Sequence, residues 1–104
     1  MTTKELTTLY REIIQREGYV APPKKSDTRD FPASVEDTRQ HLLWMLDEMD
    51  KMYLITAIGV APRTEESSRE KWHAWRGFVQ GVLWLMEWRT IDEMRDDARG
   101  ITYV

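Results

Sequence analysis

Hydrophobic residues recur along most of this chain at the spacing of amphipathic helices. In the first such segment the apolar residues fall at i, i+3, i+4, i+7 and i+8 and form one stripe: Leu6, Leu9, Tyr10, Ile13 and Ile14. Thr2 and Glu5 have the spacing of a capping box, and Gly18 suits the left-handed position that follows a helix. The pattern predicts a first helix over about 3–17.

A second helix is predicted over 35 to about 56, because Ser34 and Asp37 repeat the capping-box spacing at its start. Its core face is expected to carry six residues: Leu42, Met45, Leu46, Met49, Met52 and Tyr53. Leu43 and Trp44 fall outside that face, so both are expected on the outer side of the helix.

Residues 18–33, between these two helices, contain three prolines and the pair Lys24 and Lys25. They are predicted to form a loop. A loop of this length inside a compact domain is usually functional or disordered, and the sequence leaves both interpretations open.

Gly59, Pro62 and Thr64 carry the signals of a short turn, and a third helix is predicted to follow over about 65–89. At 100° per residue its core stripe is expected to contain six residues: Trp75, Phe78, Val79, Val82, Leu85 and Met86.

Thr90 and Glu93 form another capping-box pattern, which opens a last helix over about 91–99 that Gly100 ends. The two long helices should lie antiparallel because their connection is short. The predicted fold is therefore one all-α domain that covers the whole chain, with a helical hairpin over about 35–89 and a short helix at each end.

The third helix also carries a sector that does not belong to its core stripe. Gly77, Gly81, Trp84 and Trp88 fall together between the core stripe and the polar side. An interior glycine costs about 1 kcal/mol relative to alanine, so two of them indicate close approach of another helix or a flat ligand. Self-association of the chain is favoured; the alternative is that all these faces are buried inside one subunit.

A basic and aromatic stripe follows the polar side of the same helix, at Arg69, Trp72, His73 and Arg76. Guanidinium groups bind phosphates in a bidentate manner, and aromatic rings stack on bases. Further residues of this chemistry precede the second helix: Tyr10, Arg11, Lys24, Lys25 and Arg29. The stripe indicates a site for a small anion, against the alternative of a solvated face with extended arginine side chains.

Composition limits the function classes. A net charge of −3 argues against a general coat for DNA or RNA, and the longest strongly apolar run, 77–86, is about half of what spans a bilayer. The chain has no cysteine and no apolar signal segment near its start, which fits the cytoplasm. Glycine-rich phosphate loops, nucleophile elbows and paired histidine metal motifs are missing. We expect a binding protein without catalysis, cofactor or metal.

Residues 70–84 (EKWHAWRGFVQGVLW) and 90–95 (TIDEMR), together with 41–45 (HLLWM), resemble a small family of bacteriophage helical hairpins. This is the hairpin domain shared by the anti-CBASS cyclic-nucleotide sponge and the Thoeris anti-defence sponge. The resemblance covers about 34–99, and its most specific part is Trp-x-Gly-Phe-Val-Gln-Gly. Ala74 stands where the family often has arginine, and Arg76 where it usually has leucine.

The resemblance implies a non-enzymatic sponge that sequesters the cyclic oligonucleotides of bacterial immune signalling. Similar proteins form hexamers that take cyclic dinucleotides between paired subunits and, in some members, cyclic trinucleotides at a separate site. The resemblance implies Tyr10 as a stacking residue and Lys25 and Thr28 as phosphate contacts. It also implies three ligand-binding residues from the better-matched motif: Trp72, Trp75 and Arg76. Two alternatives remain: a phage protein that inhibits a host protein through the face around Gly77 and Gly81, and a scaffolding hairpin without ligand.

Overall fold

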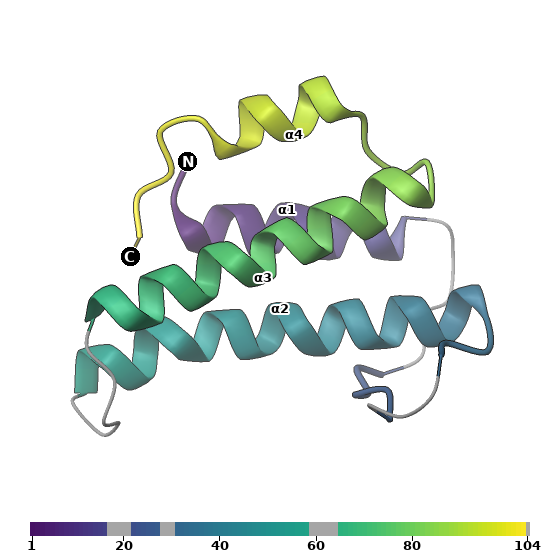
Figure 1. The fold of residues 1–104 in the computed structure, drawn as a ribbon, viewed down its shortest axis with the longest axis horizontal. Coiled ribbons are helices and arrows are strands. Elements are labelled where there is room, and N and C mark those ends of the chain that lie inside the picture. The colour runs from purple at the N-terminus through teal and green to yellow at the C-terminus, as the bar shows by residue number, and fades with distance from the viewer. Residues whose placement is uncertain (17–21, 28–30, 59–64, 104) are drawn as a thin grey trace.

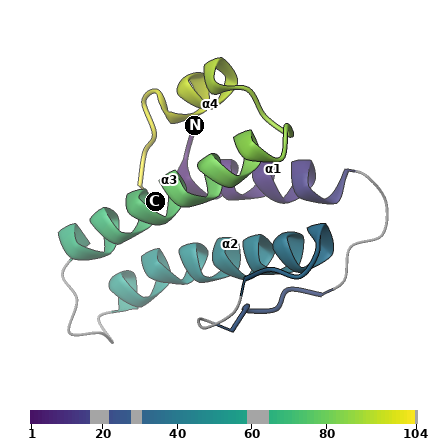
Figure 2. The ribbon, with the colours of Figure 1, turned by 45° about the vertical axis from the view of Figure 1, so that its right-hand side comes forward.

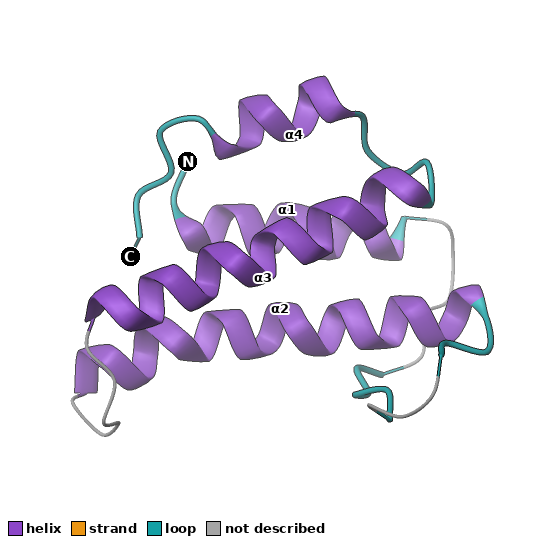
Figure 3. Ribbon diagram, in the orientation of Figure 1, coloured by secondary structure: helices purple, strands orange, loops and turns teal. Residues whose placement is uncertain are grey.

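A computed structural model describes residues 1–16, 22–27, 31–58 and 65–103 of the chain, and the side chains of 53–58 and 65 are outside its description. Within these ranges there are four helices and no strand apart from one isolated β-bridge between Thr2 and Thr102 (Figure 3). The helices are α1 (Thr3–Gln15), α2 (Val35–Ile58), α3 (Glu65–Leu85) and α4 (Ile91–Ala98). The predicted all-α class is confirmed. Predictions for Gly18, Thr28, Gly59, Pro62, Thr64 and the Tyr53 side chain lie outside the described part.

α2 packs against both α1 and α3, and α3 runs back along it (Figure 1). α4 lies on the far side of α1 and α3 from α2, as Figures 1 and 2 both show. The two ends of the chain meet, because the Thr3 N–H donates to the Thr102 carbonyl (2.9 Å) and the Thr102 N–H donates to the Met1 carbonyl (3.1 Å). No helix in the described part of the chain is long and apolar enough to cross a membrane.

The predicted helix starts are confirmed by their caps. Complete capping boxes join Thr2 to Glu5 and Thr90 to Glu93. At α2 the Asp37 N–H donates to the Ser34 Oγ (3.1 Å), but the Asp37 carboxylate accepts from the N–H of residue 33 (3.0 Å) instead of completing the box. Each cap satisfies N–H groups that the first helical turn leaves without partners.

The end of α3 differs from the prediction, because the helix stops at Leu85 and not near residue 89. Glu87 adopts φ 63°, the left-handed conformation, although it is not glycine. The Trp88 N–H donates to the Leu83 carbonyl (2.9 Å) and the Glu87 N–H to the Trp84 carbonyl (3.0 Å). These two bonds are the Schellman arrangement, which closes the helix and turns Trp88 back onto the core.

The core face predicted for α2 is confirmed at its five described members, which are all buried: Leu42, Met45, Leu46, Met49 and Met52. The prediction for Leu43 is wrong: its side chain is 2% exposed, and Trp44 is half-buried. α2 lies between two helices, so its buried face extends toward α1 beyond the stripe that one neighbour would cover.

The core stripe predicted for α3 is wrong at two of its six positions. Phe78 is 52% exposed and Leu85 is 72% exposed, whereas Trp72, assigned from the sequence to the polar side, is 1% exposed. The buried positions of α3 are Ser68, Trp72, Val79 and Leu83, so the buried face is rotated toward the side of Trp72. The C-terminal segment covers that side, where the Tyr103 ring meets the Trp72 ring edge-on at 6.3 Å.

α1 is joined to α2 by a small group of ion pairs and hydrogen bonds. Arg11 Nη2 lies 2.8 Å from Asp47 Oδ1 and 2.5 Å from Asp50 Oδ2. Lys4 Nζ lies 2.9 Å from Asp50 Oδ2, and the Thr7 hydroxyl donates to Asp50 Oδ1 at 2.7 Å. Asp50 therefore receives three side chains of α1.

α4 is tied to α1 and α3 through the buried carboxylate of Asp97. The Tyr10 hydroxyl donates to Asp97 Oδ2 (2.9 Å) and accepts from Gln80 Nε2 (2.8 Å). Arg89 donates to both carboxylate oxygens, through Nε at 2.9 Å and Nη2 at 2.6 Å. The single proton of the Tyr10 hydroxyl is therefore already used, in the hydrogen bond to Asp97.

Candidate functional site: a surface of paired lysines and tryptophans

Two tryptophans meet where α2 and α3 lie side by side. The ring centroids of Trp44 from α2 and Trp75 from α3 are 5.8 Å apart, and both side chains are half-buried. A lysine lies over each indole: Lys25 Nζ is 5.3 Å from the Trp44 ring centroid, and Lys71 Nζ is 5.2 Å from that of Trp75. We call these four residues the lysine–tryptophan array. It combines two ammonium groups with aromatic surface, the chemistry that a stacked, negatively charged ligand requires.

Lys71 reaches Trp75 because residues four apart lie on the same face of a helix. Lys25, by contrast, reaches Trp44 only because residues 22–27 run along the first half of α2. The Lys24 N–H donates to the Gln40 carbonyl (3.1 Å), and Gln40 Nε2 donates to the carbonyl of Pro22 (3.1 Å).

The third bond of this segment is the one from the Ser26 N–H to His41 Nδ1, at 3.1 Å. The His41 ring stacks on Trp44 (centroids 5.6 Å apart, planes at 28°) and meets Phe78 edge-on at 6.3 Å. Burial, together with the positive charge of Lys25, holds the pKa of His41 below its ordinary value of 6.5. The ring is therefore neutral at neutral pH, and its Nδ1 is free of a proton because it accepts a hydrogen bond.

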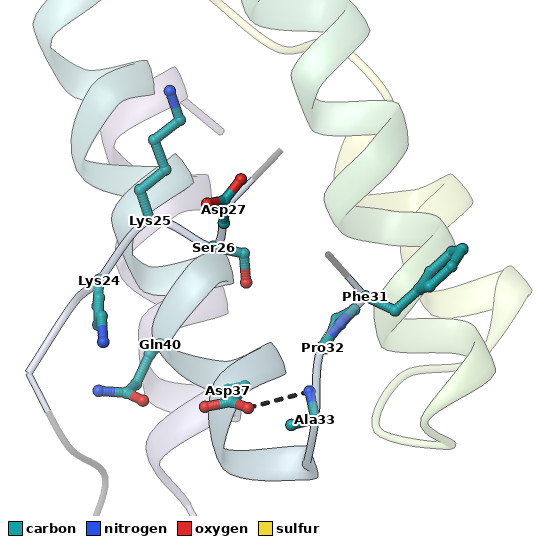
Figure 4. A pocket seen from close by; sticks show the side chains of 9 residues that line it. All are labelled: Lys24, Lys25, Ser26, Asp27, Phe31, Pro32, Ala33, Asp37 and Gln40. Carbon is teal, nitrogen blue, oxygen red and sulfur yellow. Dashed lines mark hydrogen bonds between the residues drawn. The ribbon is translucent and has the colours of Figure 1, made fainter. Parts of the chain in front are cut away.

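A hollow of about 870 Å³ lies beside the array, between residues 22–27 and residues 31–33 (Figure 4). Nine residues line it: Lys24, Lys25, Ser26, Asp27, Phe31, Pro32, Ala33, Asp37 and Gln40. Its volume falls within the range of small-molecule sites. Since two carboxylates line it together with two lysines, the hollow has no excess of positive charge, and the array at its side is the cationic part of this surface.

Two of the aromatic residues predicted to bind ligand are placed in the interior. Tyr10 and Trp72 are each 1% exposed, so neither ring presents a face to solvent in this chain. Arg11 is engaged by Asp47 and Asp50, so its positive charge is compensated. The two aromatic rings and the guanidinium predicted to bind ligand therefore make contacts within the fold instead.

The two arginines predicted on α3 lie on the other side of its buried face from Trp75. The Arg69 guanidinium lies over the Tyr103 ring at 5.5 Å, and Arg76 Nε is buried without a hydrogen-bond partner among the described residues. Burial, followed by the charges of Arg76 and Arg69, lowers the pKa of His73 on this side. Of the predicted site residues, the structure thus places Lys25 and Trp75 each against Trp44, and Lys24 lines the adjoining hollow. Thr28 and Arg29 lie outside the described part.

The sequence interpretation missed Trp44, Lys71 and His41 as members of this surface. A signal was present for Lys71, because its i, i+4 spacing to Trp75 alone places an ammonium near that ring. The i, i+3 spacing of His41 and Trp44 likewise places their rings on one face of α2, but only tertiary packing brings that face to Trp75.

Within the described residues no group of three or more histidine, aspartate or glutamate side chains could hold a metal ion. No protein family, curated protein or solved structure matches this chain.

Proposed function

We propose that this protein is a non-catalytic sponge for cyclic oligonucleotide second messengers. It binds cyclic dinucleotides such as 3′,3′-cyclic GMP-AMP, and cyclic trinucleotides, and keeps them from the effectors of bacterial anti-phage immunity. It acts in the cytoplasm of the infected host without a cofactor, a membrane or a DNA or RNA polymer. The motif resemblance suggests this ligand class.

The observation that carries the proposal is the lysine–tryptophan array. Each ammonium group lies close enough to an indole centroid for a cation–π contact, at 5.3 Å for Lys25 and 5.2 Å for Lys71. A cyclic dinucleotide carries two bases and two phosphodiesters, so it offers two flat surfaces and two negative charges within one compact molecule. The array likewise contains two aromatic rings and two positive charges. Stacking of one base on an aromatic side chain contributes about 1–3 kcal/mol.

Isothermal titration with a panel of cyclic di- and trinucleotides tests the proposal. Binding of at least one ligand at micromolar protein is the expected result, and denaturation should return that ligand chemically intact, which separates a sponge from a phosphodiesterase. Absence of heat with every ligand would end the proposal.

A pair of lysine variants tests the position of the site. Lys71→Ala should weaken binding about tenfold or more, since a hydrogen bond to a charged group contributes about 1.5–3 kcal/mol. Lys51→Ala is the matched control, because Lys51 is an exposed lysine of α2 that pairs with Glu48 at 3.1 Å, outside the array. Equal losses in both variants would show that only overall charge matters.

We further propose that the α2–α3 hairpin is the unit of a homo-oligomer, a hexamer by analogy with the similar proteins. One face of α3 is apolar and uncovered: Phe78 is 52%, Trp84 53% and Leu85 72% exposed. Gly77 and Gly81 lie between them, and a Cβ added at either glycine would meet nothing within 4 Å. No described part of the chain therefore requires glycine there, whereas a second helix that approached these two residues would. Light scattering measures the solution mass, and a clean monomer would remove this explanation.

The same face favours a second candidate, a small helical phage protein that binds and inhibits a host protein. Exposed apolar area of this extent is typical of interaction surfaces in general. Recovery of one host protein at stoichiometric amounts, lost in Leu85→Asp and accompanied by no heat with any cyclic nucleotide, would favour this candidate over the sponge.

A further inference from the structure

His41 holds one end of the segment that supplies the lysines. The Ser26 N–H donates to its Nδ1 at 3.1 Å, and Lys25, the neighbour of Ser26, lies over Trp44, the ring on which His41 stacks. The other end of the segment is held by Gln40, through its backbone carbonyl and its side-chain amide. The amide contacts do not titrate between pH 5 and pH 8, whereas an imidazole does.

We infer that protonation of His41 detaches Ser26 from α2 and removes Lys25 from Trp44, while Lys24 stays attached to Gln40. An imidazolium carries a proton on both ring nitrogens, so Nδ1 becomes a donor and can no longer accept the Ser26 N–H. Two N–H groups then face each other in place of a hydrogen bond. The position of Lys25 in the array is thereby made conditional on a neutral His41.

The electrostatic surroundings of His41 act in the same direction. Lys25 is the charged group that faces the ring from residues 22–27, and its ammonium repels a second positive charge. From α3 the ring meets Phe78, which is uncharged. One turn earlier on α2, the carboxylate of Asp37 is turned to the N–H of residue 33. None of these groups offers the imidazolium a carboxylate partner.

The direction of the pH dependence follows from linkage. The attached state holds the pKa of His41 below its ordinary value of 6.5, so protonation does not oppose attachment above that value. As the pH falls below about 6.5, the equilibrium constant for attachment should fall about tenfold per unit until the lowered pKa is reached. Only the effect on nucleotide binding rests on the proposed function; the release of Ser26 does not.

Backbone amide spectra of the ¹⁵N-labelled protein, without ligand, measure the release between about pH 7.5 and about pH 5, where histidine titrates. The Ser26 amide should shift and lose exchange protection together with protonation of His41, while the Lys24 amide in the same spectra keeps both. His41→Asn places an amide oxygen near the former Nδ1 and cannot titrate, so the pH response of Ser26 should disappear. His41→Ala lacks an acceptor and should leave Ser26 unprotected at every pH.

His73→Asn is the matched control, because His73 is the other histidine of the chain and its pKa is also lowered, yet it lies across the buried face of α3. It should leave the pH response of Ser26 unchanged. The inference is overturned if the shift and exchange protection of the Ser26 amide do not change as His41 titrates, or if their pH response persists in His41→Asn. Titration with the same panel of cyclic di- and trinucleotides at both pH values then separates the proposals: no binding of any ligand at either pH refutes the sponge alone, and the amide spectra still decide the release.

Discussion

Asp97→Asn should be among the most damaging conservative substitutions in this protein. The Asp97 side chain is 6% exposed and accepts from the Tyr10 hydroxyl and from the Nε and Nη2 of Arg89. Asparagine keeps the shape but removes the charge and turns one oxygen into a donor. Arg89, 17% exposed, then keeps one uncharged oxygen at position 97 and its 3.1 Å contact with Glu93.

Removing one partner of a buried ion pair costs about 3–5 kcal/mol, because the other charge is left unpaired. Arg89 is partly exposed and retains Glu93, so we expect a loss at or just below the lower limit of that range, about 2–3 kcal/mol. A domain of this size is stable by about 5–15 kcal/mol, so the loss is a large share of the total. Urea unfolding followed by tryptophan fluorescence measures it as a lower midpoint with an unchanged slope.

Asp96→Asn is the matched control for this prediction. Asp96 is the adjacent residue of α4, its side chain is 72% exposed, and it pairs with Arg99 at 3.6 Å on the surface. Such pairs contribute about 0–1 kcal/mol, so the control should unfold close to the wild type. The reasoning is refuted if Asp97→Asn lies within about 0.5 kcal/mol of the wild type, or if both variants lose the same amount.

Three further predictions concern stability. Glu87→Gly should stabilise the fold by about 0.5–1 kcal/mol in urea unfolding, because glycine adopts φ 63° without the strain of a Cβ; a loss would contradict the left-handed cap. Burial would raise the pKa of Asp50, but hydrogen bonds from three side chains of α1 outweigh it and lower the pKa. That contribution is fully present above the ordinary pKa of 3.8 and is lost as the pH falls below it through the lowered pKa, so Asp50→Asn should flatten the acid limb of stability against pH. Leu43→Ala should cost about 2–5 kcal/mol, whereas Leu85→Ala in dilute protein should change little, and similar values would contradict the observed burial.

The caps of the helices were predictable because they depend on residues three apart. A threonine side chain and the backbone N–H three residues later are brought together by the first turn of any helix, whatever surrounds it. Thr2 and Thr90 therefore mark the starts of α1 and α4 from sequence alone. The end of α3 escaped prediction for the opposite reason. Glu87 occupies a conformation that the sequence signal assigns to glycine or asparagine, so the helix pattern continued past its true end.

The candidate surface was only partly predictable. Lys25 and Trp75 were assigned from the sequence, but the assignment joined them to Tyr10, Trp72 and Arg76. Helical spacing places Arg76 about 100° from Trp75, and the buried face of α3 lies between the two directions. Spacing gives the angle between two side chains, but it does not say which angle faces the core.

The sequence by itself determined that this chain forms helices, where most of them begin, and that aromatic and basic residues gather along α3. These features follow from contacts within one or two helical turns. Only the tertiary structure decided which faces are buried, because that depends on the neighbours each helix receives. Contact of α2 with two helices buries Leu43, and the Tyr103 ring covers Trp72 while Phe78 and Leu85 stay exposed. The same packing placed Trp44 beside Trp75 and Lys25 over the Trp44 ring. These three residues lie far apart in the sequence.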